Sequence, residues 1–495
     1  MGDIMGENRL FIDGQLVAAE SGRTFPNVDP ATEQEIGQVA DASEADAERA
    51  IASARRAFDS TKWSTDHKLR QRCLRQLRDG LREAAPQLRE QIIAETGAPL
   101  GIVENGFQCD IPIGFLDFYA DLLDSYEWDT ELPVTNSMGA PSERMVWREP
   151  IGVVAAISPW NFPLQSNLAK VGPALAAGCS VILKPSSETP WTATMLGRIA
   201  YEHTDIPPGI FNVVTTSNSS LIGDKLVSDP RVDMISFTGS THTGRHIMAK
   251  AASTVKKVFL ELGGKSAHIV LDDADLSRAL RAGFNVCYHA GQVCALTTRF
   301  LLPKPRYEEG IEILRGYFAA IKYGDPHDRT QIMGPLVNRR QQERALRYIE
   351  KGEAEGARLV CGGGVPKHLS RGFYVEPTIF ADVTNDMTIA QEEIFGPVLA
   401  AIAYDGDDDA VRIANDSIYG LSGAIVSADL ERALRMARRI RTGTLNINGA
   451  NYYSADAPFG GYKQSGLGRE MGIEGFEEYL EKKTVAIPGY RRQGG

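Results

Sequence analysis

A cysteine and a glutamate carry the clearest chemistry in this sequence. Cys294 ends the motif AGQVC, and Glu261 begins the motif ELGGK. A thiolate attacks carbonyl carbons and a carboxylate activates water, so the two side chains could form a covalent acyl intermediate and then hydrolyse it. The alternative for Cys294 alone is a small hydrophobic residue of the core, because unpaired cysteines commonly pack in this way. The other motifs must distinguish these two interpretations.

Asn161 and Lys184 each follow an apolar run that predicts a buried strand. The Asn161 amide, in the motif SPWNFP, is flanked by stiffening prolines and could stabilise a developing oxyanion, although it could also cap the next helix. Lys184 could meet ribose hydroxyls or phosphate, because ligands of open parallel sheets lie beyond the C-terminal ends of the strands. Its alternative is an ordinary surface lysine.

Three further segments could approach a ligand. Gly239 and Ser240 follow the apolar run 234–237 and open a helix, where free N–H groups attract phosphate, although a capped turn would have the same sequence. The motif EEIFGPV at 392–398 places two acids and an aromatic ring before a strand, or simply ends a charged helix. The glycine-rich motif APFGGYKQSG at 457–466 predicts a loop, which is either functional or a connector.

Composition limits the class of protein. The chain has 495 residues, enough for two or three domains, and a net charge of -11, which argues against binding to nucleic acid or anionic membranes. The six cysteines form no C-x-x-C pair, so we expect no metal site and no disulfide framework. Unpaired thiols, no secretory signal and no apolar run long enough to span a bilayer predict a cytoplasmic protein.

Alternating apolar and amphipathic segments predict an α/β fold. Long helices are expected at 43–58 and 68–95. Next come strands at 151–157, 180–184, 211–215 and 234–237 with helices at 164–177, 192–202 and 241–252. After Glu261 we expect strands at 268–271, 298–302, 398–403 and 422–426, and helices at 276–288, 307–321 and 339–355. Such βαβ units form parallel sheets covered on both faces, so two α/β domains should meet close to Glu261.

Taken together and in this order, the motifs make the chain resemble the NAD(P)-dependent, non-acylating aldehyde dehydrogenase superfamily. The resemblance runs from about Leu10 to Ile487 and rests on PWNFP, FTGST, ELGGK, GQVC, EIFGP and PFGG. It implies two doubly wound parallel-sheet α/β domains, one Rossmann-like and cofactor-binding (1–125 and 147–260) and one catalytic (261–460). A small β oligomerisation element and a C-terminal tail would occupy 126–146 and 461–495.

The resemblance also implies a mechanism. Cys294 attacks the aldehyde as a thiolate, the Asn161 amide and the Cys294 N–H hold the oxyanion, and hydride passes to the nicotinamide. Glu261 then activates the water that hydrolyses the thioester; branches that transfer the acyl group to coenzyme A commonly lack this base. Lys170 and Glu470 match a possible proton relay. The alternative is a thiol esterase or acyl-transfer hydrolase without redox chemistry, which would not need the cofactor motifs.

For the cofactor, the resemblance implies a cleft lined by Ile157, Ser158, Pro159, Trp160, Lys184, Ser187, Gly239, Ser240, Leu262, Glu393 and Phe395. Many NAD-preferring members carry a glutamate three residues beyond the strand-end lysine, where this chain has Ser187, with Glu188 one place later. A carboxylate would repel a 2′-phosphate, whereas a serine can hydrogen-bond it, so we expect either NAD or NADP to serve. The interval from Glu261 to Cys294 is one residue shorter than is common, which should shorten the helix or turn between them.

The substrate pocket implied by the resemblance contains Phe162, Gln165, Ser166, Val293, Tyr453 and Phe459, with Ala169, Ala295, Asn451 and Tyr452 also around the tunnel. None of these is Arg or Lys, so a small-molecule aldehyde without a carboxylate of its own is expected, of medium size and aliphatic, terpenoid or aromatic. Segments 126–149 and 482–487 match family regions that pair strands across subunits, which predicts a homodimer or homotetramer.

Overall fold

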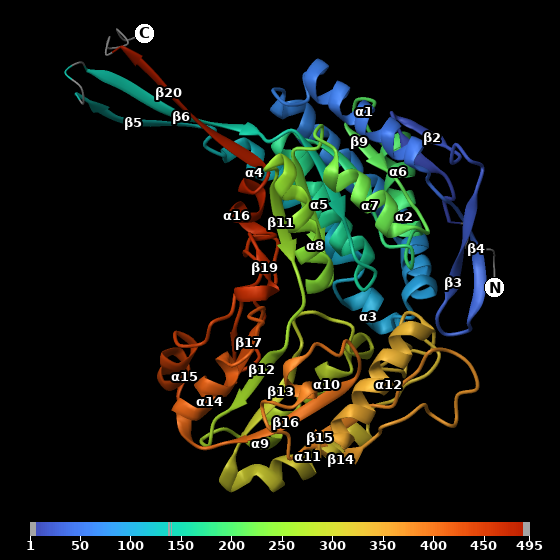
Figure 1. Cartoon of the computed structure of the whole chain (residues 1–495), viewed down its shortest axis with the longest axis vertical. Coiled ribbons are helices and arrows are strands. Elements are labelled where there is room, and N and C mark those ends of the chain that lie inside the picture. The colour runs from blue at the N-terminus through green and yellow to red at the C-terminus, as the bar shows by residue number, and fades with distance from the viewer. Residues whose placement is uncertain (1–5, 137–138, 140, 489–495) are drawn as a thin grey trace.

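The structure, a computed structural model, describes residues 6–136, 139 and 141–488 (Figure 1). Residues 1–5 of the predicted cofactor-binding domain, residues 137, 138 and 140 of the predicted oligomerisation element and residues 489–495 of the predicted tail lie outside the described residues. The described chain forms two large, mainly parallel sheets, a three-stranded antiparallel sheet and a two-stranded hairpin. The expected α/β fold class, with a small β element, is confirmed.

The first sheet has a doubly wound centre in the order β11-β10-β7-β8-β9, with all neighbours parallel. These strands are β7 (Val153–Ile157), β8 (Ser180–Lys184), β9 (Phe211–Val213), β10 (Met234–Thr238) and β11 (Lys257–Glu261). The antiparallel strands β1 (Leu10–Ile12) and β2 (Gln15–Val17) extend one edge, and β19 (Gly466–Leu467) the other. The strand order reverses beside β7, where the carboxyl ends of the strands leave a crevice for a ligand.

Helices cover both faces of this sheet. On one face lie α2 (His67–Thr96), α4 (Asp110–Ser125), α5 (Pro163–Ala177) and α6 (Trp191–His203), and on the other α1 (Glu44–Ser60), α7 (Ser219–Ser228) and α8 (Thr241–Ala251). The alternation in β7 explains this: Val154 and Ala156 join the first core, and Val153, Ala155 and Ile157 the second. With both faces buried, the central strands read as continuous apolar runs.

The second sheet has the order β14-β15-β16-β13-β12-β17-β18 and lies below the first in Figure 1. Its strands are β12 (Ser266–Val270), β13 (Thr297–Pro303), β14 (Arg358–Cys361), β15 (Thr378–Ala381), β16 (Val398–Tyr404), β17 (Gly423–Val426) and β18 (Asn446–Ile447). Its helices are α9 (Leu276–Leu280), α10 (Gly283–Val286), α11 (Tyr307–Ala319), α12 (Arg339–Ala354), α13 (Thr388–Gln391), α14 (Gly406–Asn415) and α15 (Leu430–Ala437). All its pairings are parallel except β14 with β15.

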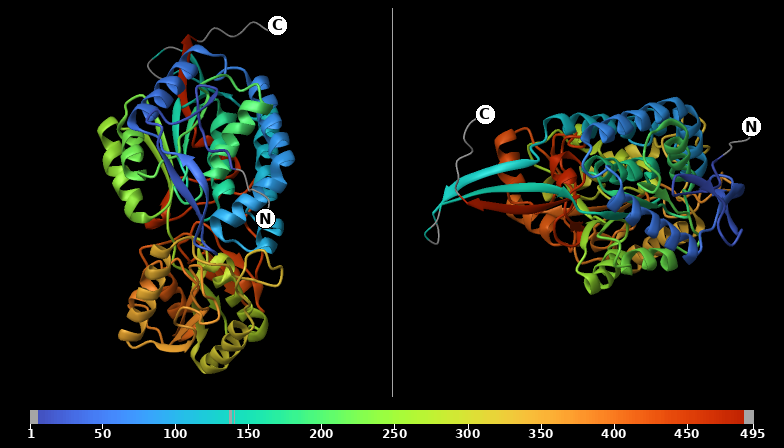
Figure 2. Two further views of the ribbon diagram at one scale, coloured as in Figure 1. Left: turned by 90° about the vertical axis from the view of Figure 1, so that its right-hand side faces the viewer. Right: turned by 90° about the horizontal axis from the view of Figure 1, so that it is seen from above.

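A three-stranded antiparallel sheet projects away from both large sheets (Figures 1 and 2). It has the order β20-β6-β5, with β5 (Asp129–Thr135), β6 (Ser142–Pro150) and β20 (Leu480–Pro488), so β20 finds its partner far away in the sequence. The remaining elements are the hairpin β3 (Thr24–Asp29) and β4 (Gln34–Ala40), the helices α3 (Leu100–Asn105) and α16 (Gly472–Glu477), and the 3-10 turns η2 (Ala252–Thr254), η3 (Tyr288–Gly291), η4 (Lys304–Arg306) and η5 (Lys463–Ser465).

Most expected elements agree with the structure to within a few residues, but the single helix expected at 276–288 is wrong. The chain forms the short helices α9 and α10 and then the turn η3, in which His289 and Ala290 have the left-handed φ values 49° and 54°. The periodic pattern is overridden because the segment must turn sharply to place Cys294 just before the start of β13. The division into cofactor-binding, catalytic and oligomerisation segments remains a prediction; β19, from segment 461–495, joins the first sheet. In the part of the chain that the structure describes, no helix is both long and apolar enough to cross a membrane.

Candidate active site

Cys294 and Glu261 come from different sheets and meet at the junction between them. Glu261 is the last residue of β11, and Cys294 lies in the loop that leads into β13. The Cys294 thiol and the Glu261 carboxyl group lie close enough for each to shift the pKa of the other. Burial and the nearby Glu470 carboxylate raise the pKa of Glu261 well above its usual range, and burial and the charge of Glu261 raise the pKa of the Cys294 thiol. Burial therefore favours the protonated, neutral form of both groups.

Two glycines make this meeting possible. The chain crosses from β11 to β12 through residues 262–265. A Cβ at Gly264 would lie 2.5 Å from the carbonyl oxygen of Cys294, and a Cβ at Gly263 would collide with the Glu393 carboxylate. The ELGGK motif is therefore required for close approach of the backbone rather than for a positive φ.

Asn161 is fixed beside the nucleophile. It follows β7, and its side-chain Nδ2 donates to the carbonyl of Gln292 at 2.8 Å. Its own carbonyl accepts from Nε2 of Gln108 at 3.0 Å. An amide nitrogen has two hydrogens, so the second remains available for an oxygen atom bonded near Cys294.

The loop before Cys294 is held by Gln292. Its Nε2 donates to the carbonyl of His289 at 3.1 Å, and its Oε1 accepts from the Val337 N–H at 2.9 Å. Gly291, with φ 78°, continues the left-handed turn, and a Cβ there would collide with the backbone of Gly396. These contacts fix a backbone conformation that Ala and His adopt only at a cost in free energy.

Lys170 and Glu470 form a buried ion pair behind Glu261. The Lys170 Nζ lies 2.5 Å from Oε1 of Glu470, and the two side chains are 0% and 6% exposed. Lys170 also faces the ring of Phe259, 5.1 Å from its centroid. Glu470 raises and Lys170 lowers the pKa of Glu261, so the pair sets the charge environment of that carboxylate.

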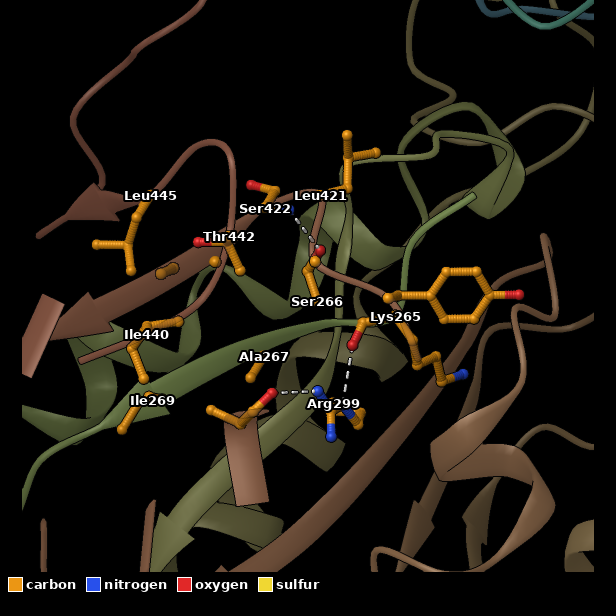
Figure 3. Close-up of a pocket in the computed structure, with 15 residues that line it drawn as sticks. Lys265, Ser266, Ala267, Ile269, Arg299, Leu421, Ser422, Ile440, Thr442 and Leu445 are labelled. Atoms are coloured by element: carbon orange, nitrogen blue, oxygen red, sulfur yellow. Dashed lines mark hydrogen bonds between the residues drawn. The ribbon is translucent and has the colours of Figure 1, made fainter. Parts of the chain in front are cut away.

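Arg299 anchors the chain after the glycine turn. Its guanidinium donates to the carbonyls of Lys265 at 2.9 Å, Ile413 at 2.9 Å and Ala414 at 3.0 Å, as Figure 3 shows in part. The cavity drawn in Figure 3 has a volume of only about 10 Å³, room for about one water, and does not reach Cys294. It therefore belongs to the support of the site and not to a substrate channel.

A cavity of about 170 Å³ lies on one side of Cys294. Glu393 lies on its wall, where its Oε1 accepts a hydrogen bond from the Gly264 N–H at 2.9 Å. Burial raises the pKa of this carboxyl group to about 7. The rings of Trp160 and Phe395 pack edge to face with centroids 5.4 Å apart. The turn into α8 and two residues of α12 also contribute to the walls. The other lining residues are Pro159, Asn161, Thr238, Gly239, Ser240, Glu261, Gly263, Cys294, Gln341 and Arg344.

Trp160 also lines a second, wide polar cavity of about 630 Å³ at the ends of β8 and β9. Its walls are Trp160, Ser186, Ser187, Glu188, Ser217, Asn218, Ser219, Ser220 and Arg340. Lys184 lies beneath the rim, where Nζ donates to the carbonyl of Pro185 and to Oγ of Ser219, each at 3.1 Å. Burial lowers the pKa of Lys184 to about 8.

A third cavity, of about 530 Å³, opens on the other side of Cys294. Aromatic rings form much of its wall: Tyr453 packs edge to face on Phe107 and Phe459, with centroids 4.9 Å and 5.3 Å away. Gln165 donates to the Tyr453 hydroxyl. Its walls contain no Lys or Arg, and its carboxylates are Glu261 and Glu470. Asn161, Thr238, Glu261 and Cys294 line both this cavity and the 170 Å³ cavity, so the reactive pair stands where the two meet.

Comparison with known proteins agrees with this arrangement. The family model described as the aldehyde dehydrogenase family matches residues 16–485. The chain belongs to the aldehyde dehydrogenase family. Over 479 residues it is 42% identical to a 3-succinoylsemialdehyde-pyridine dehydrogenase of Pseudomonas, covering 96% of this chain and 98% of that protein.

Solved structures show the same fold. A Mycobacterium tuberculosis aldehyde dehydrogenase in complex with NAD⁺ has 42% sequence identity and a TM-score of 0.93, covering 98% of this chain and 99% of that one. A cysteine-to-alanine mutant of aldehyde dehydrogenase C from Pseudomonas syringae, in complex with NAD⁺ and octanal, has 39% identity and a TM-score of 0.91, covering 97% and 96%. The chain is accordingly an NAD(P)-dependent aldehyde dehydrogenase that acts on small aldehydes.

The structure brings most residues predicted for the site of this dehydrogenase to the cavity walls. Phe162, Gln165, Ser166, Val293, Tyr453 and Phe459 all line the 530 Å³ cavity. Ile157, Ser158 and Leu262 are buried and are not among the residues that line the three cavities. Ala169 is also buried, 1% exposed, and does not line the tunnel.

Sequence reasoning missed walls that come from distant segments. Residues 105–107, at the end of α3 and after it, line the 530 Å³ cavity, as do Asn285 and Tyr288. No local motif marks 105–107, and their role depends on α4 packing beside α5. Gln341 and Arg344 of α12 line the 170 Å³ cavity, and Arg340 lines the 630 Å³ cavity. The sequence shows an amphipathic helix with several arginines here, but it does not show which turn of the helix faces the cavities.

We expect Lys170→Met to lower the free energy of unfolding by about 3–5 kcal/mol, because Glu470 is left buried without its cation. The double variant Lys170→Met/Glu470→Leu should recover part of this loss. Denaturant titration measures both. Arg198→Met, which breaks an ion pair whose side chains are each 40% exposed, is the control and should cost less than about 1 kcal/mol. A loss for Lys170→Met no larger than that of the control would contradict the buried pair.

Proposed function

We propose that the enzyme oxidises aldehydes to carboxylic acids through a thioester on Cys294 that Glu261 helps to hydrolyse. The observation that carries the proposal is that Cys294 and Glu261 lie together at the point where the two cavities meet, since both residues line both cavities. In the first step Cys294 attacks the carbonyl carbon as a thiolate, and the sulfur–carbon bond forms as the carbonyl electron pair moves to oxygen. The free second hydrogen on Asn161 Nδ2 and the Cys294 N–H then hold the oxyanion.

The residues present fit a nicotinamide cofactor on the side opposite the aldehyde. Thr238 Oγ1 and Glu261 Oε1 are buried without a hydrogen-bond partner among the described residues, and both face the 170 Å³ cavity. Ser240 caps α8, so free N–H groups at this helix end can meet phosphate oxygens. When bound, the oxidised nicotinamide supplies the hydride acceptor. Glu393, anchored on the Gly264 N–H, would hold the nicotinamide ribose, and Lys184 would hold the adenosine ribose.

Glu261 would then act as a base on water. Its pKa is raised, so it takes up a proton more readily than an ordinary carboxylate. The buried Lys170–Glu470 pair acts on the pKa of Glu261, and we assign it the removal of that proton. The redox-free hydrolase alternative is not favoured, because the similar proteins are aldehyde dehydrogenases.

The substrate that the 530 Å³ cavity favours is an uncharged aldehyde of medium size, aliphatic, terpenoid or aromatic. Its aromatic walls bury an apolar body, while Glu261 and Glu470 would repel a substrate carboxylate. The octanal complex of the P. syringae relative supports this, since octanal is an uncharged aliphatic aldehyde. A cytoplasmic location stays a prediction.

The projecting sheet supports assembly into a homodimer or homotetramer. β5 and β20 are its outer strands, and most side chains of β20 are exposed. Unpaired edges of this kind are a liability unless another chain covers them.

Cys294→Ala should abolish turnover, by at least about 10⁴-fold, because Cys294 supplies the thiol at the junction of the cavities. Cofactor affinity, measured by fluorescence or calorimetry, should stay within a small factor. Cys361→Ala is the matched control and should keep its activity, since Cys361 lines none of these cavities. Near-normal turnover by Cys294→Ala would eliminate the covalent mechanism.

Glu261→Gln should separate the two half-reactions. Hydride transfer precedes the water step, so stopped-flow absorbance should show a burst of reduced cofactor close to the enzyme concentration. Steady turnover should then be slower by about 10²–10⁴-fold, the usual contribution of a general base. If the first turnover is itself blocked, Glu261 is needed before the thioester forms and the proposed order is wrong.

Light scattering tests the assembly. We expect a mass of two or four times the 54.0 kDa chain at micromolar concentration. A stable monomer under these conditions would refute the role given to the projecting sheet.

A further inference from the structure

Arg340 is a loosely paired cation on the wall of the polar cavity. It is the second residue of α12, its side chain is 74% exposed, and its nearest carboxylate is Glu188, whose Oε1 lies 3.8 Å from Nη2. That separation is too long for a hydrogen bond. Its neighbour Arg339, in contrast, is engaged with Glu33 at 2.6 Å and with the ring of Phe373. Arg340 therefore presents donors to whatever enters the cavity.

The other walls of the cavity offer hydroxyl and N–H groups that can donate hydrogen bonds to an anion. Ser187 and Ser220 have hydroxyls that make no hydrogen bond to the described residues, and Ser219 and Ser220 begin α7. The first N–H groups of a helix lack partners within the helix, and its dipole favours negative charge there. Glu188 supplies the opposing charge on this wall.

Lys184 is poorly placed to neutralise an anion in this cavity. The residue is 3% exposed, and its ammonium group already donates to Pro185 and Ser219. It lies below the rim and is not among the wall residues. The cation that can move toward a ligand is Arg340.

We propose that the enzyme accepts NADP⁺ as well as NAD⁺, and that Arg340 is the residue that pairs with the 2′-phosphate, leaving Glu188 to do so. This inference rests on the proposed function, which places the adenosine ribose beside Lys184 and Ser187. In the NAD⁺ complex Arg340 stays near Glu188. In the NADP⁺ complex its guanidinium lies between the phosphate and Glu188 and screens their repulsion, while Ser187 contributes a hydroxyl.

Arg340 belongs to the segment that carries the second sheet, yet it faces a cavity of the first. The same helix places Gln341 and Arg344 on the 170 Å³ cavity, and Arg344 donates to the Glu393 carbonyl at 2.6 Å. The first two turns of α12 thus run along the whole cleft, with Arg340 at the adenosine end and Arg344 at the nicotinamide end.

The test compares kcat/KM for NADP⁺ and NAD⁺ with one aldehyde in the full-length enzyme. In Arg340→Gln, kcat/KM for NADP⁺ should fall by about 10- to 100-fold through KM, because a charged hydrogen-bonded partner is lost. NAD⁺ should change by less than about twofold. Arg340→Lys should retain part of the NADP⁺ activity. The control is Arg347→Gln, a charge removal on the same helix outside the cleft, which should leave both values unchanged.

Two further variants test the partners. Glu188→Gln removes the competing carboxylate and should raise kcat/KM for NADP⁺ by about two- to fivefold. Ser187→Glu restores a carboxylate at the ribose and should depress NADP⁺ use while sparing NAD⁺. An equal fall for both cofactors in Arg340→Gln, or no change for either, would overturn the assignment, as would a wild-type enzyme that uses NAD⁺ but rejects NADP⁺.

Fragment binding separates this inference from the proposed function. Calorimetry with 2′,5′-ADP and with ADP needs no catalysis, and wild type should bind 2′,5′-ADP with an advantage that Arg340→Gln loses. If neither cofactor is reduced with any aldehyde, the proposed function fails while this comparison still decides the role of Arg340. Equal binding of 2′,5′-ADP by the two proteins would reject it.

Discussion

Close approach of the backbone at Gly263 and Gly264 is the constraint on which the rest of the site depends. The chain leaves the first sheet at Glu261 and enters the second at Ser266, and a side chain at either glycine would push away Glu393 or the Cys294 backbone. Because there is none, a carboxyl group from one sheet can lie beside a thiol from the loop of the other. The same turn gives Glu393 its anchor, the Gly264 N–H. Arg299 then holds the far end of the turn through the Lys265 carbonyl.

The electrostatics of the junction follow from that packing. Glu261 and Glu470 are buried and, together with Glu393, act on Cys294, and Lys170 supplies the nearby positive charge. Burial raises the pKa of both Cys294 and Glu261, so ionising one favours leaving the proton on the other. This suits a reaction in which the thiol must lose a proton as it attacks and the carboxylate must later receive one from water. Glu261 and Glu470 also line the 530 Å³ cavity, which is why we propose an uncharged substrate for it.

Much of the fold could be predicted from the sequence because local signals and tertiary structure agree there. The apolar runs ending at Lys184 and before Gly239 are strands, and the residues after them reach the cleft, because strand ends converge in a parallel sheet. The helix expected at 276–288 failed because its periodicity competes with the need to present Cys294. Phe107 could not be found, since its place depends on packing between distant helices. Ala169 is apolar and helical, and nothing in the sequence separates a tunnel wall from the core.

The central claim is a covalent acyl intermediate on Cys294, and peptide mass spectrometry tests it most directly. Glu261→Gln enzyme would be mixed with oxidised cofactor and an uncharged aldehyde, quenched in acid and digested. The account predicts a mass increase equal to the acyl group, located on the peptide that contains Cys294 and absent when cofactor is omitted. Turnover without any adduct, or an adduct on another residue, would contradict the account.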